Sequence, residues 1–220
     1  TGIRNYLKKY QFKNVTISDF LAQMEQDSGK DLSDFKRTWL DGTAFPEDQV
    51  RKRLMDASAI IASFYALQHE MTASSGNSEA IIQRVWNNTN SALLKRRIVE
   101  RYFKSLSTDF IRNAFDSNDI EIRQALAIAT DKISTDMKPE FESLLNDKSY
   151  VTIENALYKL WIYFPGDRGK YLDSAQGIVG FANKNVRLLW LTLALLTKDY
   201  QETEKSKYYE ELSGYTAPEY

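Results

Sequence analysis

The stretch "FDSNDIEIRQAL", residues 115–126, resembles "LNDKSYVTIENAL", residues 145–157, and "FANKNVRLLWL", residues 181–191, is a weaker third copy. Each copy has a short polar turn with Asn or Asp, then a β-branched residue, then an apolar helix. This order is typical of helical-pair repeats of the HEAT type. We therefore expect an all-α fold: a solenoid of HEAT-like helical hairpins, wound as a right-handed superhelix and preceded by three short helices.

The spacing of the copies supports a repeat of somewhat shorter period than is usual for HEAT proteins. Ala125 and Ala156 are 31 residues apart, and Ile153 and Val186 are 33 residues apart. The segment from Ile81 to Leu106 is a candidate for a degenerate earlier copy. Because the copies are weak, an irregular helical bundle remains an alternative to a solenoid.

The positions of apolar residues, glycine and proline also indicate helices. Apolar residues recur at helical spacing over residues 3–10, 17–24 and 32–40, and then over a long helix at about 47–70. Ser28 and Gly29 are expected to end the second of these helices. The four prolines all fall where other signals also indicate boundaries: Pro46, Pro139, Pro165 and Pro218.

Composition excludes several classes of function. The 220 residues include 29 basic and 30 acidic side chains, so bulk charge suggests neither nucleic acid nor an anionic membrane as a partner. No apolar run is long enough for a membrane span, and no targeting signal is present in this sequence. The chain has no Cys, which excludes disulfides, thiol catalysis and Cys-ligated metals. We expect a soluble protein whose compartment the sequence does not give.

His69-Glu70 is the opening of H-E-x-x-H, in which two histidines one helical turn apart bind zinc and the glutamate activates water. The fifth position is Ala73, and His69 is the only histidine in the chain. We therefore assign no catalytic, cofactor-binding or metal-binding residue to this chain and interpret His69 as a surface or helix-end residue. The stretch "PGDRGKY", residues 165–171, lacks the spacing of a phosphate-binding loop and is interpreted as an interhelix turn.

The basic stretch "LLKRRIVERYFK", residues 93–104, offers candidate binding residues. Arg97, Arg101 and Lys104 share one helical face, opposite an apolar stripe that includes Leu94 and Ile98. These three cations are candidates to face an anion, either a substrate carboxylate or an acidic partner. A solvated helix face is the alternative.

The first 46 residues carry a further pattern. In order they contain Gly2, Tyr6, Leu7, Phe12, Asn14, Thr16, Ser28, Gly29, Lys30, Phe35, Trp39, Phe45 and Pro46. This series resembles the end of the catalytic domain in zinc aminopeptidases of the aminopeptidase N and leukotriene hydrolase type. Many members insert a small β-sandwich after the Phe-Pro, whereas Pro46-Glu47-Asp48 leads directly into a helix here, as in the compact members.

The resemblance implies two domains: residues 1–46 as the terminal helices of a truncated catalytic domain, and residues 47–220 as the C-terminal HEAT-like helical domain. In that family, H-E-x-x-H and a later glutamate hold zinc, and all such residues lie upstream of the matched stretch. The resemblance therefore implies zinc in the parent protein and no cofactor in this chain. The implied partners are the missing N-terminal and catalytic domains of the same polypeptide and, in the parent, peptide substrates.

The function that the resemblance implies is that of a non-catalytic portion of a zinc aminopeptidase, a metallopeptidase and hydrolase that removes N-terminal residues from peptides. This portion would cap the active site and limit substrate access. The alternative is a HEAT-type scaffold, or a peptide- or protein-binding module, with no enzyme attached. The sequence encoded upstream of Thr1 discriminates between the two, because only the first requires H-E-x-x-H there.

Overall fold

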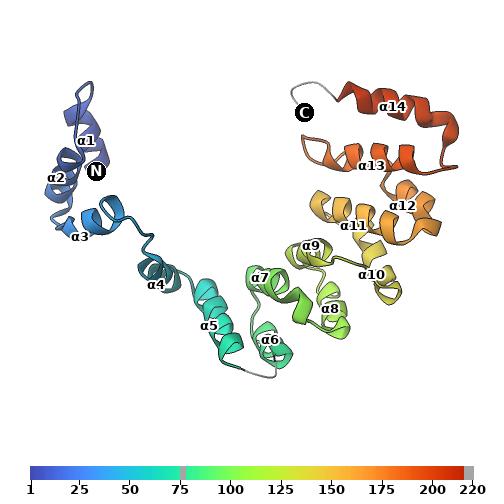
Figure 1. Ribbon diagram of the computed structural model, residues 1–220, viewed down its shortest axis with the longest axis horizontal. Helices are drawn as coiled ribbons and strands as arrows, with labels where there is room; N and C mark the ends of the chain where they lie inside the picture. The colour runs from blue at the N-terminus through green and yellow to red at the C-terminus, as the bar shows by residue number, and fades with distance from the viewer. Residues whose placement is uncertain (75–77, 216–220) are drawn as a thin grey trace. The chain divides into compact units, whose positions relative to one another are not determined.

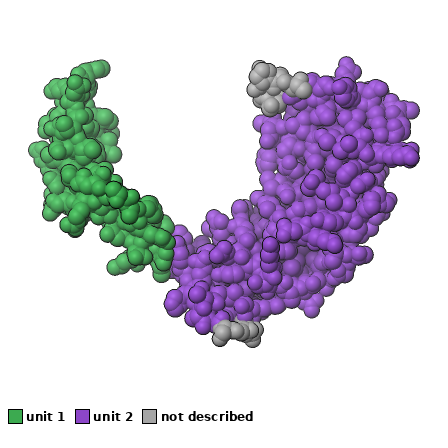
Figure 2. Space-filling model, viewed as in Figure 1, with its two compact units in different colours: residues 1–58 green, residues 59–220 purple. Residues whose placement is uncertain are grey.

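The computed structural model describes residues 1–74 and 78–215. The described residues form fourteen α-helices with short 3₁₀ and π turns, and they contain no strand. The all-α prediction is therefore confirmed. Within the same residues, none of the helices combines the length and the apolar character that a membrane crossing requires. The chain divides into two compact units, unit 1 at Thr1–Ser58 and unit 2 at Ala59–Tyr220 (Figure 2).

Unit 1 contains the short N-terminal helices, and its helix ends follow the sequence signals. Its helices are α1 (Gly2–Tyr10), α2 (Ile17–Ser28), α3 (Ser33–Phe35), which continues into a π-helical turn, η1 (Lys36–Leu40), and α4 (Glu47–Ala57). Thr16 and Asp19 form a capping box at the start of α2. Gly29 follows α2 with a φ of 66°, a left-handed conformation that glycine adopts readily.

Unit 1 buries little of its apolar surface. Leu21 and Gln23 are its only buried residues within the described range. We expect that a fragment of a larger domain would expose some of Ile3, Tyr6, Leu7, Tyr10, Phe20 and Trp39. Ile3, Leu7 and Trp39 are indeed exposed, at 64%, 61% and 38%, whereas the other three are partly buried. The exposure of some of these six side chains is confirmed, whereas their covering by a larger domain stays a prediction.

The single long helix expected over residues 47–70 is wrong. The structure has two helices there, α4 and α5 (Ala59–Ala73), separated by Ser58 in an extended conformation with φ −145° and ψ 112°. No glycine or proline marks this break. The two halves differ in packing, because Leu67 of α5 is buried in the core of unit 2 whereas α4 has no buried residue. The predicted domain boundary between residues 46 and 47 is a separate matter and stays a prediction.

Unit 2 consists of helices that pack mainly on their neighbours along the chain (Figure 1). Helices α5, α7, α9, α11 and α13 form one row, in which each packs on the next. The intervening helices α6, α8, α10 and α12 are linked across repeats by contacts such as the ring pairs Trp86–Phe110 and Phe115–Phe141. The helices after α5 are α6 (Ser78–Asn87), α7 (Ala92–Tyr102), α8 (Thr108–Phe115), α9 (Ile120–Ala129), α10 (Lys138–Ser143), α11 (Tyr150–Tyr163), α12 (Arg168–Ala175), α13 (Asn185–Leu196) and α14 (Lys205–Gly214).

This arrangement is a solenoid-like stack with one continuous core. Fully buried side chains from successive helices meet in it, among them Ile98, Leu126, Leu157 and Trp190. The predicted solenoid-like, all-α architecture is thus present in unit 2. The HEAT assignment and the right-handed superhelix stay predictions.

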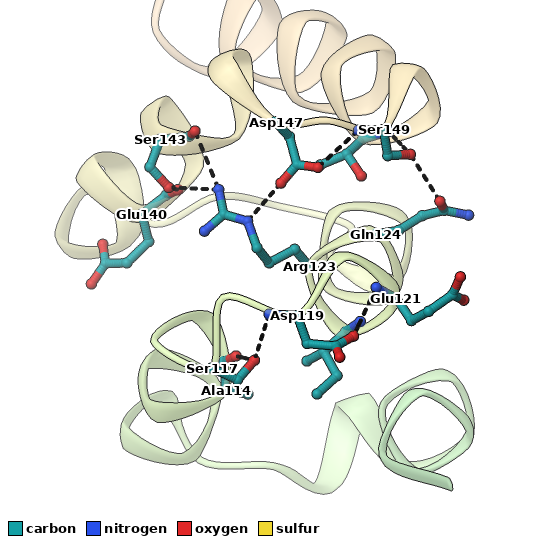
Figure 3. Close-up of polar contacts among 12 residues, drawn as sticks. Ala114, Ser117, Asp119, Glu121, Arg123, Gln124, Glu140, Ser143, Asp147 and Ser149 are labelled. Carbon is teal, nitrogen blue, oxygen red and sulfur yellow. Dashed lines mark hydrogen bonds and ion pairs between the residues drawn. The ribbon is translucent and has the colours of Figure 1, made fainter. Parts of the chain in front are cut away.

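The polar turn that recurs in the sequence lies at the start of helices in the row, among them α9 and α11 (Figure 3). Side chains of this turn hydrogen-bond to backbone N–H groups, and we call each such turn a joint. The N-cap side chains of α7, α9 and α11 each accept a hydrogen bond from a backbone N–H in the first turn. The N–H of the N-cap residue, in turn, donates to the side chain two residues earlier. The N-cap residues with that earlier residue are Ser91 with Thr89, Asp119 with Ser117, and Ser149 with Asp147. Asn185 with Asn183, at the start of α13, repeats the second of these bonds.

The joint also bonds to the preceding helix of the row. Ser149 Oγ donates to Gln124 Oε1 of α9 at 2.9 Å, and Asn185 Nδ2 donates to Glu154 Oε2 of α11 at 2.5 Å. Ser149 therefore both caps α11 and attaches it to α9, whereas Asn185 attaches α13 to α11 from the first position of its helix. The polar turns before α11 and α13 are the source of these contacts.

Candidate substrate-facing surface

Helix α7 holds two of the three candidate cations. Leu94 and Ile98 are buried on its inner side, as the apolar stripe predicts, and Arg97 and Arg101 are exposed on its outer side. Lys104 lies just beyond the helix, in the 3₁₀ turn η2 (Phe103–Ser105), and is also exposed. The structure therefore places the three candidates at the C-terminal half of α7 and its continuation.

The three cations differ in how far their charge is balanced. Arg97 Nη1 donates to Glu100 Oε2 at 2.9 Å. Lys104 Nζ is 3.9 Å from Asp131 Oδ2, with both side chains almost fully exposed. Within the described part of the chain, Arg101 forms no ion pair. Arg101 and Lys104 are thus the two whose charge is most available to an external anion.

The other cations of the basic stretch have structural partners. Arg96 Nε donates to Glu100 Oε1 at 2.7 Å, and its Nη1 donates to Glu121 of α9. These hydrogen bonds raise the pKa of Arg96. Lys95 Nζ lies 5.1 Å from the ring centroid of Trp86. Two of the five basic residues therefore bind α7 to its neighbours.

Next to the candidate cations, the C-terminal ends of α9 and α11 are tied together. Lys159 Nζ donates to the backbone oxygens of Ala127 and Ile128, at 2.5 and 2.9 Å. Burial lowers the pKa of Lys159, and the charge of Asp131 opposes this shift. Tyr163 Oη donates to the backbone oxygen of Asp131 at 2.9 Å, beside the ion pair of Lys104.

The outer face of α11 adds apolar side chains to this surface. On one flank of α11, Lys159 bonds to α9; on the other, Trp161 Nε1 donates to Thr197 Oγ1 beyond α13. Tyr158 and Ile162 lie between these flanks on the helix and are 49% and 38% exposed. Ile128 of α9 is exposed as well. We call Arg97, Arg101, Lys104, Ile128, Tyr158 and Ile162 the row surface.

His69 and Glu70 belong to no group of potential metal ligands among the described residues. His69 is exposed on α5, and Glu70 forms an ion pair with Arg84 of α6. Among the residues that the structure describes, no group of three or more His, Cys, Asp or Glu side chains is arranged to hold a metal ion. The expectation that this chain holds no metal stays a prediction.

The "PGDRGKY" stretch is an interhelix turn in its first three residues only, because residues 168–171 begin α12. Pro165–Asp167 form a 3₁₀ turn between α11 and α12. Its charged residues are used within the fold: Asp167 accepts from Lys138 Nζ at 2.6 Å, and the Arg168 guanidinium stacks 3.7 Å from the Trp161 ring centroid.

The sequence is similar to two aminopeptidases. Aminopeptidase N of Streptomyces lividans is 33% identical over 76 residues, which cover 33% of this chain and 8% of that protein. Aminopeptidase N of Lactococcus lactis subsp. lactis is 27% identical over 110 residues, which cover 49% of this chain and 12% of that protein. No protein-family profile and no solved structure matches the chain.

These similarities are weak and partial, and they indicate an origin like that of aminopeptidase N. The matched stretches span only about a tenth of the length of either relative. The aminopeptidase activity in their names belongs to proteins much longer than the matched stretches.

Sequence reasoning missed the apolar half of the row surface. A signal for it was present in α11, "YVTIENALYKLWIY", which is apolar nearly all round rather than on one stripe. A helix of this kind in a two-layer stack has more apolar positions than the core uses, and the surplus is exposed. The third candidate, Lys104, was predicted on the same helix as Arg97, and the structure places it two residues beyond the end of α7, in η2.

Proposed function

We propose that this chain is the non-catalytic C-terminal portion of a zinc metallo-aminopeptidase, an enzyme that removes N-terminal residues from peptides. The observation that carries the proposal is the similarity to two aminopeptidases N. The ordered series of residues from Gly2 to Pro46 supports it, since that series resembles the end of the catalytic domain. Zinc and the hydrolytic residues belong to other parts of the parent polypeptide in this proposal.

Unit 1 provides physical support for a parent larger than this chain. Its helices expose Ile3, Leu7, Trp39 and Phe45, the last at 70%. Helices this short are marginal by themselves and gain their stability from tertiary packing. In the parent, these side chains pack on the zinc-bearing domain, which is the principal partner of this chain.

Unit 2 caps the active site in the proposal and limits which peptides enter. Its row surface faces the peptide: Tyr158, Ile162 and Ile128 contact apolar side chains, and Arg101 and Lys104, with Arg97, attract a carboxylate. Guanidinium and ammonium groups bind carboxylates by charge-assisted hydrogen bonds, which are about twice as strong as neutral ones. An acidic partner protein is the other anion that these cations would suit.

The proposal is tested first on the polypeptide encoded upstream of Thr1. It must contain H-E-x-x-H and a later glutamate, and the purified parent must bind zinc and release N-terminal residues. An upstream sequence without these residues, or a parent without peptidase activity, contradicts the proposal.

The row surface is tested separately in the parent enzyme. The double variant Arg101→Ala with Lys104→Ala should raise KM severalfold for a peptide with a free C-terminal carboxylate and leave KM for its C-terminal amide unchanged. Lys52→Ala with Arg53→Ala, on the exposed side of α4, is the matched control. An equal change of KM for the peptide acid and the peptide amide would show that Arg101 and Lys104 do not bind the substrate carboxylate.

A second candidate is a HEAT-type scaffold or binding module. The recurring joints of unit 2 favour it, because solenoid stacks commonly present extended binding surfaces. This candidate requires no zinc domain in the same polypeptide, so the upstream sequence separates it from the first.

A further inference from the structure

Helix α1 packs on α2 by one side only. Tyr6 lies with its ring centroid 5.1 Å from that of Phe20, Asn5 Nδ2 donates to Asp27 at 3.1 Å, and Lys9 Nζ donates to Gln23 at 2.9 Å. Positions 3, 4, 7 and 8 fall on the other side of the helix.

That other side is apolar and positively charged at once. Ile3 and Leu7 lie one turn apart and are both more than half exposed. Arg4 and Lys8 lie beside them, are exposed, and form no ion pair within unit 1, all of whose residues the structure describes. We call Ile3, Arg4, Leu7, Lys8 and Phe12 the α1 surface.

Phe12 is the most exposed large apolar residue in unit 1. Its side chain is fully exposed, and its backbone has a φ of 62°, a left-handed conformation that residues other than glycine rarely adopt. Between α1 and the following segment lies a hollow of about 420 Å³, lined by Tyr6, Leu7, Lys8, Tyr10, Gln11 and Val15. Exposed apolar side chains that gather in this way mark surfaces that other proteins contact.

The positive charge of residues 1–18 indicates which groups a surface that covers α1 must supply. Residues 1–18 contain four basic residues, Arg4, Lys8, Lys9 and Lys13, and no Asp or Glu. Lys9 is hydrogen-bonded to α2, which leaves Arg4 and Lys8 on the α1 surface. Burying these cations without carboxylate partners would be unfavourable, so a stable cover must supply such groups.

We infer that the α1 surface docks on a protein surface of the parent that is apolar at its centre and carries carboxylates facing Arg4 and Lys8. This inference rests on the proposed function, because the partner is the zinc-bearing domain of the same polypeptide. Beyond the proposed function, it states that the domain's surface is negatively charged and that Arg4 and Lys8 contact its carboxylates. A second copy of this chain fits less well, because two α1 surfaces would bring cations together.

The test is hydrogen–deuterium exchange of residues 2–10, compared between the complete parent polypeptide and the 220-residue chain. In the parent, these amides should exchange at least tenfold more slowly than in the chain. Arg4→Glu with Lys8→Glu should remove most of that protection. Lys52→Glu with Arg53→Glu, which makes the same change of charge on exposed residues of α4, should remove none.

Salt separates an electrostatic contact from a general loss of structure. Raising NaCl from 0.05 to 0.5 M should speed exchange of α1 in the unaltered parent and slow it in the Arg4→Glu, Lys8→Glu variant, because screening weakens both attraction and repulsion. Leu7→Ser should reduce protection with no such reversal by salt.

Three outcomes overturn the inference. Protection of α1 that survives the charge reversal shows that no carboxylates face these cations, while the proposed function stands. Equal exchange in parent and chain shows that α1 is not covered by the parent. Protection of α1 in the isolated chain at high concentration, or on vesicles with 30% phosphatidylserine, assigns the surface to a second copy or to lipid. A parent without zinc and peptidase activity is a distinct result, which contradicts the proposed function itself.

Discussion

Arg123 of α9 and Asp147 of the loop before α11 form an ion pair across the joint between two repeats, with Nε 2.6 Å from Oδ2 (Figure 3). The two side chains are only 14% and 5% exposed. Asp147 also accepts the N–H of Ser149, so one carboxylate serves both the joint and the cap. This pair is the least exposed salt bridge among the described residues.

Asp147→Ala should therefore destabilise unit 2 by about 2–4 kcal/mol, because it leaves the Arg123 guanidinium without a carboxylate in a largely buried position, with only its hydrogen bonds to Ser143. Urea unfolding followed by circular dichroism measures the loss. Lys207→Ala breaks a far more exposed pair with Glu204 and should cost about 0–1 kcal/mol. Equal losses of unfolding free energy in the two variants would show that burial does not strengthen the ion pair between Arg123 and Asp147.

The caps themselves give a second prediction. Asp119→Ala and Ser149→Ala should each cost about 1 kcal/mol, because an N-cap side chain satisfies a backbone N–H that the helix cannot. The two losses should be similar, since Asp119 accepts two backbone N–H groups, whereas Ser149 accepts one and donates to Gln124. Ser174→Ala in α12 is the control, because that hydroxyl bonds only a carbonyl of its own helix. A control as costly as the caps would contradict the role given to the joints.

Two buried tyrosines predict loss of stability in alkali. Burial, together with a hydrogen bond to Glu142, raises the pKa of Tyr171 well above its usual value, and burial with a hydrogen bond to Asp173 does the same for Tyr200. In the unfolded chain, each ionises near pH 10, whereas in the folded chain it keeps its proton. The unfolded state therefore binds fewer protons above pH 10, and stability falls as pH rises.

The expected slope is about 1.4 kcal/mol per pH unit for each such tyrosine above pH 10, before any other group contributes. Tyr171→Phe and Tyr200→Phe should each flatten the decline between pH 10 and 11.5, measured as urea midpoints at each pH. Tyr209→Phe, at an exposed position, should leave the slope unchanged. A slope that neither buried variant alters would refute this assignment.

The isolated chain should neither hold zinc tightly nor cleave aminoacyl substrates. Hydrolytic zinc sites normally use three protein ligands plus water, and the chain has one His and no Cys. Elemental analysis after dialysis should give far less than one zinc per chain, and His69→Ala should not change it. Stoichiometric zinc, or peptidase activity that follows the purified chain, would contradict this prediction.

The fold was predictable where local chemistry decides it. Thr16 caps α2 and Gly29 ends it, as their types indicate, and the polar turns before Ile120 and Tyr150 mark helix starts because their side chains bond to the first backbone N–H groups. Ser58 was not predictable, since it is neither glycine nor proline and the apolar spacing runs through it. Only the packing of α5 in unit 2 distinguishes the two sides of the break.

The candidate surface was predictable in part. The spacing of Arg97 and Arg101 shows which side of α7 is exposed, because Leu94 and Ile98 occupy the other side. It does not show that Arg96 bonds to Glu121, since that contact joins residues far apart in the chain and depends on how α7 and α9 align. For the same reason, the exposure of Tyr158 depends on where the neighbouring helices contact α11.

The recurring joint has a consequence for how this protein can change over generations. Because Ser149 and Asn185 each attach their helix to the preceding one through a side chain at the helix start, a helix pair can be duplicated or deleted there with a similar attachment at the new boundary. The number of repeats, and with it the length of unit 2, can then differ among related proteins without a new type of contact. In unit 1 a related attachment joins α3 to α2, where the N–H of Leu32 donates to Glu25 and the N–H of Ser33 donates to Asp31.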